Sequence, residues 1–510
     1  MNKKNNLIIL ISVFALVKLL IHLYTNAFAG YGIFRDELYY LSCASRPDIG
    51  YVDQPPFSIW ELTLTKSVIG DSVFAIRLIP ALISSILVFI TGLITKRLGG
   101  QAVAISIACS AIIISPIVLG MNTIYSMNTF DHLFWALGFY FVLKLVDENK
   151  QKDWIILGLI MGTALLNKIG FLWFAAGLFI SILLTKDRVK LKTFSPWLAA
   201  IIALIIFSPF IIWNFLNDFA HIEFIRNASL NKYSGLTPFD FIFGQILLQN
   251  PYSILIWLPG LYYLFFHPAG KKYKAAGIIY LTAFIILVIN WHSKAEYLSA
   301  AYPVLFAAGG VFWEKFEIKK NIIWIRYALL IPLILSGVLT LPLALPILPV
   351  ETYIKYADAI GMSPSSPESK QLAELPQFYA DMFGWKDLAK SISEVYESLP
   401  EEDKNDVVVF APNYGVAGAV EHFSKKYSLP KVISPHNNFW IWGYGDKIAN
   451  TIIVVGGDEN DHKNSCKEVY LAKIHMTKYA MPYENNRKIF VCKGLLVSPN
   501  TIWEHEKNFE

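Results

Sequence analysis

Charged residues are scarce in this chain. Asp, Glu, Lys and Arg make up 16% of its 510 residues, whereas soluble domains carry about 25%. Hydrophobic residues make up 55%, and the mean hydropathy is positive. This composition excludes a protein that is soluble throughout, so most of the chain must face lipid or membrane-buried protein. The net charge of +5 is small for this length and does not suggest a nucleic-acid partner.

Cysteine is also scarce, and its spacing matches no metal-binding motif. The chain has Cys43, Cys109, Cys466 and Cys492, with no CxxC pair and no Cys/His metal spacing. The sequence therefore predicts no metal ligand set and requires no cofactor, although it leaves the question of a divalent metal open. Cys466 and Cys492 are compatible with a disulfide and equally with two free thiols.

Apolar runs long enough to cross a bilayer, roughly 17–25 residues, recur from Leu7 to Pro346. We predict a mainly α, polytopic fold of about eleven membrane helices, with 11–13 as the range. The predicted spans are 7–28, 72–95, 102–120, 128–147, 154–169, 170–185, 194–216, 241–266, 275–291, 296–313 and 321–346. The first resembles a secretory signal but is longer than its usual apolar core, so we expect an uncleaved anchor. The stretch 154–185 would be roughly 48 Å long as one helix, so we expect a break near Lys168.

Basic residues collect in alternate connections between these spans. By the positive-inside rule these connections are cytoplasmic, so the loops at about 30–71 and 217–240 face outward. The basic groups are Lys3/Lys4, Lys96/Arg97, Lys144/Lys150/Lys152, Lys186/Arg188/Lys190/Lys192, Lys271/Lys272/Lys274 and Lys315/Lys319/Lys320.

The composition changes after Val350, where polar residues return and apolar runs shrink to strand length. We predict two domains: a transmembrane domain over 1–350 and a soluble extracytoplasmic α/β domain over 351–510. Within the latter, 407–410 and 451–455 predict buried strands, and 416–426 predicts a helix. The Gly-rich run at 414–418 predicts a tight turn, because it is too weak to indicate nucleotide binding.

An acidic pair follows the first span. Asp36 and Glu37 precede Tyr39 and Tyr40, and Asp53-Gln54-Pro55-Pro56 comes shortly afterwards. A carboxylate beside aromatic rings at the membrane surface suits a general base or a clamp on a sugar hydroxyl. The competing interpretation is a helix cap. Asp131 has the same two interpretations, since it lies three residues into a predicted helix on the outward side.

Three isolated cations lie near the outer surface. Lys168 is flanked by apolar residues, while Arg226 is in the 217–240 loop and Lys294 ends a span. An ionisable group at membrane depth costs about 2.5–3.5 kcal/mol on insertion scales and usually faces a cavity or a partner. Together with the carboxylates, these cations predict a site for an anionic lipid head group beside a base.

These segments resemble the GT-C glycosyltransferases of the bacterial family 39 type, the superfamily of protein O-mannosyltransferases and lipid A aminoarabinose transferases. The resemblance rests on Asp36-Glu37-Leu38-Tyr39-Tyr40, Tyr51-Val52-Asp53-Gln54-Pro55-Pro56, Asn128-Thr129-Phe130-Asp131, Leu165-Leu166-Asn167-Lys168-Ile169-Gly170 and Lys294-Ala295-Glu296-Tyr297-Leu298. The runs at 413–419 and 434–443 are similar to the external domain of a bacterial subgroup.

The resemblance implies transfer of one sugar from a polyprenyl-phosphate donor to an acceptor hydroxyl, with inversion, at the outer face of a bacterial inner membrane. The acceptor would be a glycolipid, a polysaccharide or a protein. One departure from the family is the neutral Gln54, where related enzymes often have Lys. The implied catalytic residues are Asp36, Glu37 and Asp131; those for the donor phosphate and lipid are Tyr40, Tyr51, Gln54, Lys168, Arg226, Lys294 and Tyr297. In the soluble domain, His436, Trp440 and Trp442 are candidates for binding the acceptor, because aromatic faces stack on sugars, and they are equally compatible with packing against the membrane domain or its lipid interface.

Two other functional classes compete with this interpretation. A lipid or glycolipid transporter, or a flippase, would also bury charges within the membrane, but the sequence has no obvious repeated half with interrupted helices. A lipid-binding envelope scaffold would leave the acidic pair at Asp36 unexplained.

Overall fold

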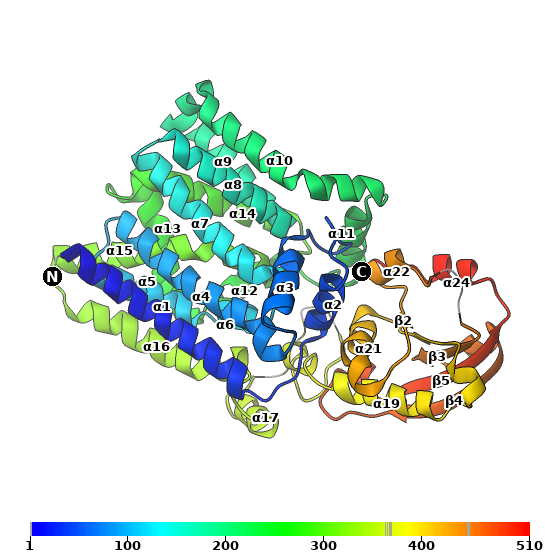
Figure 1. Ribbon diagram of the computed structural model, residues 1–510. Coiled ribbons are helices and arrows are strands. Elements are labelled where there is room, and N and C mark those ends of the chain that lie inside the picture. The colour runs from blue at the N-terminus through cyan, green and yellow to red at the C-terminus, as the bar shows by residue number, and fades with distance from the viewer. Residues whose placement is uncertain (1–2, 363, 365, 367–369, 446–448) are drawn as a thin grey trace.

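The computed structural model describes residues 3–362, 364, 366, 370–445 and 449–510. It consists of a large helical bundle and a smaller domain built on a β-sheet at one end of that bundle (Figure 1). The helices of the connection after α1 lie between the two parts, and the N-terminal end of α1 lies at the opposite end of the bundle.

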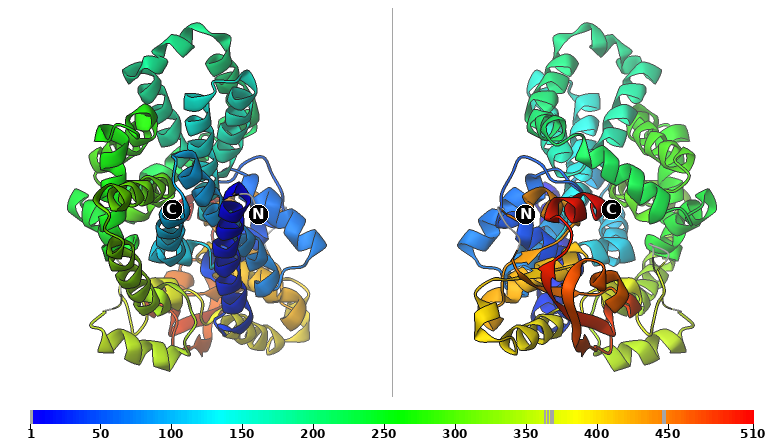
Figure 2. Two further views of the ribbon diagram at one scale, coloured as in Figure 1. Left: turned by 90° about the vertical axis from the view of Figure 1, so that its left-hand side faces the viewer. Right: turned by 90° about the vertical axis from the view of Figure 1, so that its right-hand side faces the viewer.

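The bundle is formed by long apolar helices that pack side by side (Figures 1 and 2). Helix α1 packs along α4, α8 along α10, and α13 along α15. Glycine permits the close contact between α8 and α10, because a Cβ on Gly158 would lie 2.6 Å from the carbonyl oxygen of Ala199. The helices are α1 (Lys3–Phe28), α4 (Val73–Arg97), α5 (Ala102–Ile114), α6 (Pro116–Met121), α7 (Met127–Asp147), α8 (Gln151–Asn167), α9 (Leu172–Leu184), α10 (Phe194–Leu216), α11 (Ala220–Asn231), α12 (Pro238–Leu248), α13 (Ile254–Phe266), α14 (Lys274–Ile289), α15 (Tyr302–Lys320) and α16 (Trp324–Ala344).

Judged by length and composition, fewer helices are able to cross a membrane than the sequence predicts. Among the described residues, six helices are long and apolar enough to cross a membrane, or up to eight if each of two bent pairs counts as one span. The bends are 104° between 169–184 and 186–192, and 93° between 238–248 and 251–266. Some predicted spans fall on short helices, such as the 13-residue α5. The count of eleven therefore stays a prediction.

The expected break near Lys168 is confirmed. Helix α8 ends at Asn167, Lys168 is extended with φ −154° and ψ 125°, and a short 3-10 helix begins at Ile169. This break presents the Lys168 side chain at the end of the bundle that faces the smaller domain.

The smaller domain has a mixed five-stranded sheet in the order β2-β1-β3-β5-β4. Strand β1 runs parallel to β2 and β3, whereas β5 runs antiparallel to both of its neighbours. The predicted strands at 407–410 and 451–455 are confirmed as β1 and β3. The elements are α17 (Val350–Ala359), α18 (Gln377–Ala380), α19 (Trp385–Glu397), α20 (Glu401–Lys404), β1 (Val407–Phe410), α21 (Tyr414–Tyr427), β2 (Val432–Ile433), α22 (Asn438–Trp442), β3 (Thr451–Val455), α23 (Glu459–Lys463), β4 (Cys466–His475), β5 (Arg487–Leu495) and α24 (Pro499–His505).

The predicted tight turn at 414–418 is wrong, because these residues form the first turns of α21. Their glycines serve helix packing instead. Helix α21 lies against α2 (Arg35–Ala44) of the connection after α1, and a Cβ on Gly418 would lie 2.9 Å from the backbone carbon of Leu38. A Cβ on Gly415 would meet the Arg35 side chain at 2.8 Å. The small residues therefore allow the two helices to touch.

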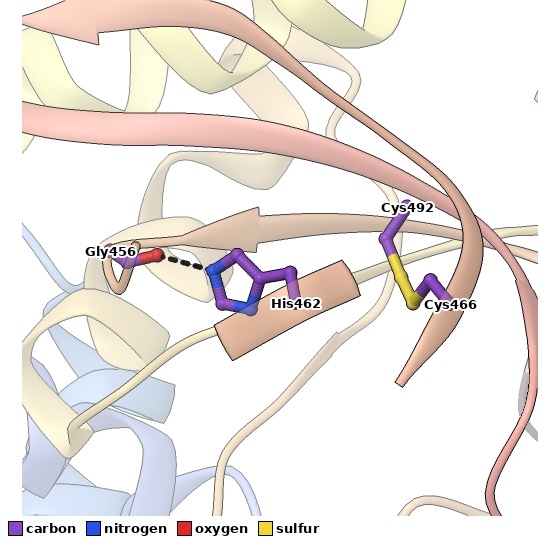
Figure 3. Close-up of a disulfide and its surroundings, with 4 residues drawn as sticks. All are labelled: Gly456, His462, Cys466 and Cys492. Atoms are coloured by element: carbon purple, nitrogen blue, oxygen red, sulfur yellow. Dashed lines mark hydrogen bonds between the residues drawn. A yellow bond between two sulfur atoms is a disulfide. The ribbon is translucent and has the colours of Figure 1, made fainter. Parts of the chain in front are cut away.

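Cys466 and Cys492 form a disulfide between β4 and β5 (Figure 3). Their Cα atoms are 5.8 Å apart, within the ordinary range for this bond. The bond resolves the alternative that the sequence left open. It crosslinks two neighbouring antiparallel strands, and the two cysteines are 26 residues apart in sequence.

The contact between α2 and α21 yields a testable prediction. Gly418→Leu should lower the stability of the folded protein by roughly 1–3 kcal/mol, the usual effect of overpacking a tight contact. It should also detach the smaller domain enough to speed proteolysis between 360 and 375. Thermal unfolding in detergent and limited proteolysis measure both effects.

Lys425→Leu is the matched control, because Lys425 lies on the same helix but is exposed. An equal loss of stability in both variants would contradict the packing role of Gly418.

Candidate active site

Helix α2 begins at Arg35, so the acidic pair lies in its first turn, where carboxylates interact favourably with the helix dipole. The N-cap residue Phe34 is extended, and its backbone N–H donates to Glu37 Oε2 at 2.9 Å. The Arg35 N–H donates to the backbone oxygen of Asp381 at 3.0 Å. The start of α2 is thus fixed both by the side chain of Glu37 from the same helix and by Asp381 of the smaller domain.

Glu37 is completely buried and pairs with Arg77 of α4. The guanidinium donates from Nε to Oε1 at 2.8 Å and from a terminal nitrogen to Oε2 at 2.7 Å. The backbone N–H of Tyr125 also donates to Oε1 at 2.7 Å. Because both oxygens of Glu37 are engaged, this carboxylate joins α2, α4 and the connection before α7.

Asp36 points the other way and remains accessible, with 39% of its side chain exposed. Its Oδ1 accepts a hydrogen bond from the Tyr414 hydroxyl at 2.8 Å and lies 3.4 Å from Arg35 Nε. Tyr414 is the first residue of α21. The two carboxylates of the pair therefore have different environments, one sealed in an ion pair and one open at the junction between the domains.

Asp53 is a second carboxylate at this junction. Tyr39 donates to Asp53 Oδ1 at 3.0 Å and also contacts Asn438 Oδ1 of α22 at 3.1 Å. The Val52 N–H donates to the same Asn438 oxygen at 2.7 Å. Burial raises the pKa of Asp53 to about 7, and the negative charge of nearby Asp36 adds to the shift.

A separate cluster surrounds the end of α8. Lys168 Nζ donates to Asn128 Oδ1 at 2.7 Å and lies 3.6 Å from Asp131 Oδ2. Asp131 is 6% exposed, and its Oδ1 is buried without a hydrogen-bond partner among the described residues. Lys168 Nζ also lies 5.3 Å from the centre of the Tyr297 ring. The cluster thus brings together Asp131, Lys168 and Tyr297.

Lys294 extends this cluster towards the 217–240 loop. Its Nζ lies 3.4 Å from Glu296 and 4.9 Å from the ring centre of Tyr233. The Tyr297 hydroxyl interacts electrostatically with both Tyr233 and Lys294. Two lysines therefore flank the same aromatic side chain.

Tyr40 links the two clusters. Its hydroxyl accepts from the backbone N–H of Met127 at 3.3 Å, one residue before the Asn128 that holds Lys168. Tyr51 and Gln54, by contrast, organise the loop. The Tyr51 hydroxyl accepts from the Asp48 N–H at 2.9 Å, and the Tyr51 N–H donates to the backbone oxygen of Gln54 at 3.1 Å.

Arg226 is not brought to either cluster. It is exposed on α11 and makes no ion pair in the part of the chain that the structure describes. The cation that reaches the junction from the 217–240 loop is Lys232, which lies near enough to Asp53 to lower its pKa against the larger effect of burial. Lys232 lines a cavity of about 210 Å³ together with Arg35, Lys370, Tyr414, His436 and Glu510.

His436 lies in this cavity, whereas the two tryptophans do not line it. The His436 ring packs 4.8 Å from the Tyr414 ring, and burial lowers its pKa to about 3, so it is neutral. Trp440 donates from Nε1 to the backbone oxygen of Trp503 at 2.9 Å. Trp442 stacks under the Arg46 guanidinium at 4.4 Å. Both tryptophans thus make packing contacts around the junction.

Sequence reasoning missed three contributors to the site: Lys232, Tyr414 and Asn438. The loop that carries Lys232 was identified, but Arg226 was chosen within it. Tyr414 and Asn438 reach the junction by tertiary contacts across 378 and 386 or more residues, for which the sequence offers no local signal. No cluster of three or more His, Cys, Asp or Glu side chains suited to a metal occurs among the described residues.

One family model and several solved structures match this chain. Residues 53–213 match the family model described as dolichyl-phosphate-mannose-protein mannosyltransferase. No curated protein matches the chain.

Solved structures match over nearly the whole chain. The structure of ArnT from Cupriavidus metallidurans bound to undecaprenyl phosphate superposes with a TM-score of 0.61 at 14% identity, covering 95% of this chain and 97% of that one. Its apo state gives 0.61 at 13% identity, with 96% and 98% covered. The Archaeoglobus fulgidus oligosaccharyltransferase tethered to an acceptor peptide gives 0.51 at 13% identity, with 80% and 63% covered. At these identities the likeness establishes the fold.

The ion pair of Glu37 predicts a large effect on stability. Arg77→Met should destabilise the protein by roughly 3–5 kcal/mol, because it leaves a buried carboxylate without its partner. The double variant Arg77→Met/Glu37→Gln should recover part of this loss. Thermal unfolding of the single and double variants measures the difference, and an unchanged melting temperature in Arg77→Met would contradict the structural role.

The raised pKa of Asp53 predicts a pH dependence of stability. The folded state favours the protonated carboxyl between the ordinary pKa of about 4 and about 7, so this group makes the protein less stable as pH rises through that window. Asp53→Asn should remove this contribution. Asp36→Asn should lower the pKa of Asp53, because a neighbouring negative charge is lost. Melting temperatures measured between pH 4 and 8 test both; an identical pH profile in wild type and Asp53→Asn would contradict the assignment.

Proposed function

We propose that this chain, which belongs to the GT-C glycosyltransferase superfamily, transfers one sugar from a polyprenyl-phosphate donor to an acceptor hydroxyl at the outer surface of a bacterial inner membrane. The observation that carries the proposal is the placement of an accessible carboxylate, Asp36, at the same end of the bundle as the Lys168 and Lys294 cluster. A base and a phosphate site are the two requirements of this reaction.

Asp36 acts as the general base. Its accessible carboxylate accepts the proton of the acceptor hydroxyl while that oxygen forms a bond to the anomeric carbon of the sugar. The bond from this carbon to the phosphate oxygen breaks, and its electron pair leaves with the polyprenyl phosphate. A single displacement of this kind inverts the anomeric configuration. Tyr414 holds one carboxylate oxygen through its 2.8 Å hydrogen bond, which orients the carboxylate for the acceptor.

Lys168 and Lys294 stabilise the charge that develops on the departing phosphate. Fixed cations at the position where charge appears are the main means of lowering such a barrier. Asp131 serves Lys168 rather than the substrate, since its carboxylate lies 3.6 Å from the ammonium group and holds it in place. Tyr297 presents its ring to Lys168 and forms the wall between the two lysines.

Glu37 and Tyr40 are positioning residues in this scheme. Glu37 has no oxygen left for a proton transfer, because Arg77, Phe34 and Tyr125 occupy both. It therefore sets the orientation of α2 and hence of Asp36. Tyr40 fixes the distance between α2 and the start of α7.

The orientation in the membrane follows from independent features. The basic connections predict a cytoplasmic side opposite to the 30–71 loop. A disulfide between Cys466 and Cys492 suits an oxidising extracytoplasmic compartment. The smaller domain and the site beneath it therefore face outward.

The general base is tested by Asp36→Asn. Sugar transfer should fall by about 10²–10⁴-fold, the usual contribution of general base catalysis, while the protein stays folded. The assay follows label from polyprenyl-phosphate hexoses and pentoses into envelope material, using membranes that contain the variant as their source of this protein.

Asp71→Asn is the control, because Asp71 is an exposed carboxylate of the same external segment. Wild-type turnover in Asp36→Asn would reject the proposed base.

The phosphate site is tested by Lys168→Gln. This change should weaken binding of undecaprenyl phosphate and lower kcat about tenfold or more, because one fixed cation is lost from the leaving group. Arg226→Gln should have little effect, since Arg226 is exposed and lies outside both clusters. A larger effect of Arg226→Gln than of Lys168→Gln would instead indicate a phosphate site in the 217–240 loop.

A further inference from the structure

The segment 507–510 follows α24 and lies at the junction between the two parts of the molecule, beside α11 and α22 (Figure 1). Its Phe509 is 2% exposed and belongs to an apolar cluster with Val52 and with Trp213 of α10. The segment is therefore packed into the larger part of the molecule, although the proposed reaction uses none of its residues.

On one side the segment is bound to α11. The Lys507 ammonium lies 2.7 Å from a carboxylate oxygen of Glu223, and Asn227 donates from Nδ2 to the backbone oxygen of Phe509 at 2.9 Å. Glu223 and Asn227 are four residues apart, so they lie on the same face of this helix. Two neighbouring side chains of α11 thus hold the segment.

Helix α11 also reaches the two lysines proposed to bind the donor phosphate, Lys168 and Lys294, here called the phosphate cluster. The helix ends at Asn231, and the ring of Tyr233, two residues later, lies 4.9 Å from Lys294 Nζ. Tyr297 lies between the two lysines. The position of α11 therefore determines where one wall of the phosphate cluster lies.

On the other side the segment is bound to His436. The His436 Nε2 lies 2.8 Å from the backbone oxygen of Glu510. Because a carbonyl oxygen only accepts hydrogen bonds, Nε2 carries the ring proton. Burial lowers the pKa of His436 to about 3, so the ring is neutral and Nδ1 is an acceptor. This atom accepts from the backbone N–H of Tyr414 at 3.4 Å.

The neighbours of His436 strengthen the attachment. The Asn437 N–H donates to the backbone oxygen of Asn508 at 2.9 Å, and the Asn508 N–H donates to the backbone oxygen of Pro435 at 3.0 Å. Asn437 Oδ1 accepts from the Glu510 N–H at 3.2 Å. Backbone and side-chain bonds together fix the segment to the connection between β2 and α22.

Tyr414 connects this arrangement to the base. It is the first residue of α21, and its hydroxyl donates to Asp36 at 2.8 Å. Both ring nitrogens of His436 are engaged and the residue is 7% exposed, so neither nitrogen is available to an acceptor sugar. This geometry suits a residue that supports Tyr414 rather than one that contacts the substrate.

We propose that His436 is a positioning residue that orients Asp36 through Tyr414. Through its bonds to α11, the segment 507–510 also fixes this base relative to the phosphate cluster. This inference rests on the proposed glycosyl transfer and adds the residues that set the spacing between its two charged centres.

Distances between spin labels test the link without an assay of transfer. Labels at Ile225→Cys on α11 and Lys425→Cys on α21, both exposed, report the separation of these helices in the full-length protein in lipid nanodiscs. The double variant Asn227→Ala/Lys507→Met should broaden the distance distribution, because both bonds between the segment and α11 are lost.

The matched control is Asn231→Ala/Lys467→Met, which changes the same residue types at exposed positions outside the link. This control should keep the wild-type distance distribution. An unchanged distribution in Asn227→Ala/Lys507→Met, or equal broadening in the control, would reject the link.

Maximal rates of sugar transfer, measured with the membrane assay used for Asp36→Asn, test the positioning role. His436→Phe keeps an aromatic ring and removes both hydrogen bonds, so it should lower the rate about tenfold. His436→Asn should recover most of this loss, because its Oδ1 can replace Nδ1 as the acceptor for the Tyr414 N–H.

A double variant shows whether His436 acts through Tyr414. Tyr414→Phe should also lower the rate about tenfold, because Asp36 loses a charge-assisted hydrogen bond. Adding His436→Phe should cause little further loss, since residues that act as a unit are not additive. A wild-type rate in His436→Phe, or two losses that multiply in the double variant, would reject the positioning role.

These outcomes are separable from that of the proposed function. Wild-type transfer in Asp36→Asn together with a broadened distribution in Asn227→Ala/Lys507→Met would reject the base and leave the link intact. Transfer that depends on Asp36 but not on His436 would leave the base intact and reject the positioning role alone.

Discussion

The site depends on the buried ion pair between Glu37 and Arg77. A carboxylate without water around it is stable only when its oxygens are paired, and here two nitrogens of Arg77 and two backbone N–H groups supply four donors. These donors belong to different segments, so satisfying Glu37 fixes α2 relative to α4 and to the start of α7. The orientation of the preceding residue, Asp36, follows from that arrangement. One carboxylate is made rigid so that its neighbour can stay accessible.

The smaller domain completes the environment of Asp36 from outside. Gly418 and Gly415 allow α21 to approach α2, Tyr414 at the start of α21 donates to Asp36, and Asn438 holds the loop at Val52. The interface is polar at its centre and closely packed at its edge. The smaller domain is therefore part of the site rather than a separate module joined by a linker.

Sequence reasoning succeeded where the signal is local. The break at Lys168 follows from the length of an apolar run, and the strands β1 and β3 follow from runs of β-branched residues with turn-forming neighbours. The short helix at Asp36 follows from an acidic pair that lies directly after an apolar span. These features need no knowledge of how distant segments pack.

Sequence reasoning failed where tertiary contacts determine the local structure. The Gly-rich run at 414–418 has the composition of a turn, and only the contact with Leu38 explains why its glycines lie in a helix. Arg226 and Lys232 are both basic residues of one loop, and the direction of each side chain depends on how α11 lies on the bundle. The number of spans also depends on tertiary packing, because bends such as the 93° bend between 238–248 and 251–266 decide whether two helices form one span.

The 378 residues between Asp36 and Tyr414 have a consequence for biosynthesis. Asp36 emerges from the ribosome early, when most of the later helices do not yet exist. The hydroxyl that orients it emerges only after the whole bundle has been made. A nascent polypeptide therefore has Asp36 without its Tyr414 hydrogen bond, and the environment of Asp36 is complete only after the last domain has been made and has packed against α2.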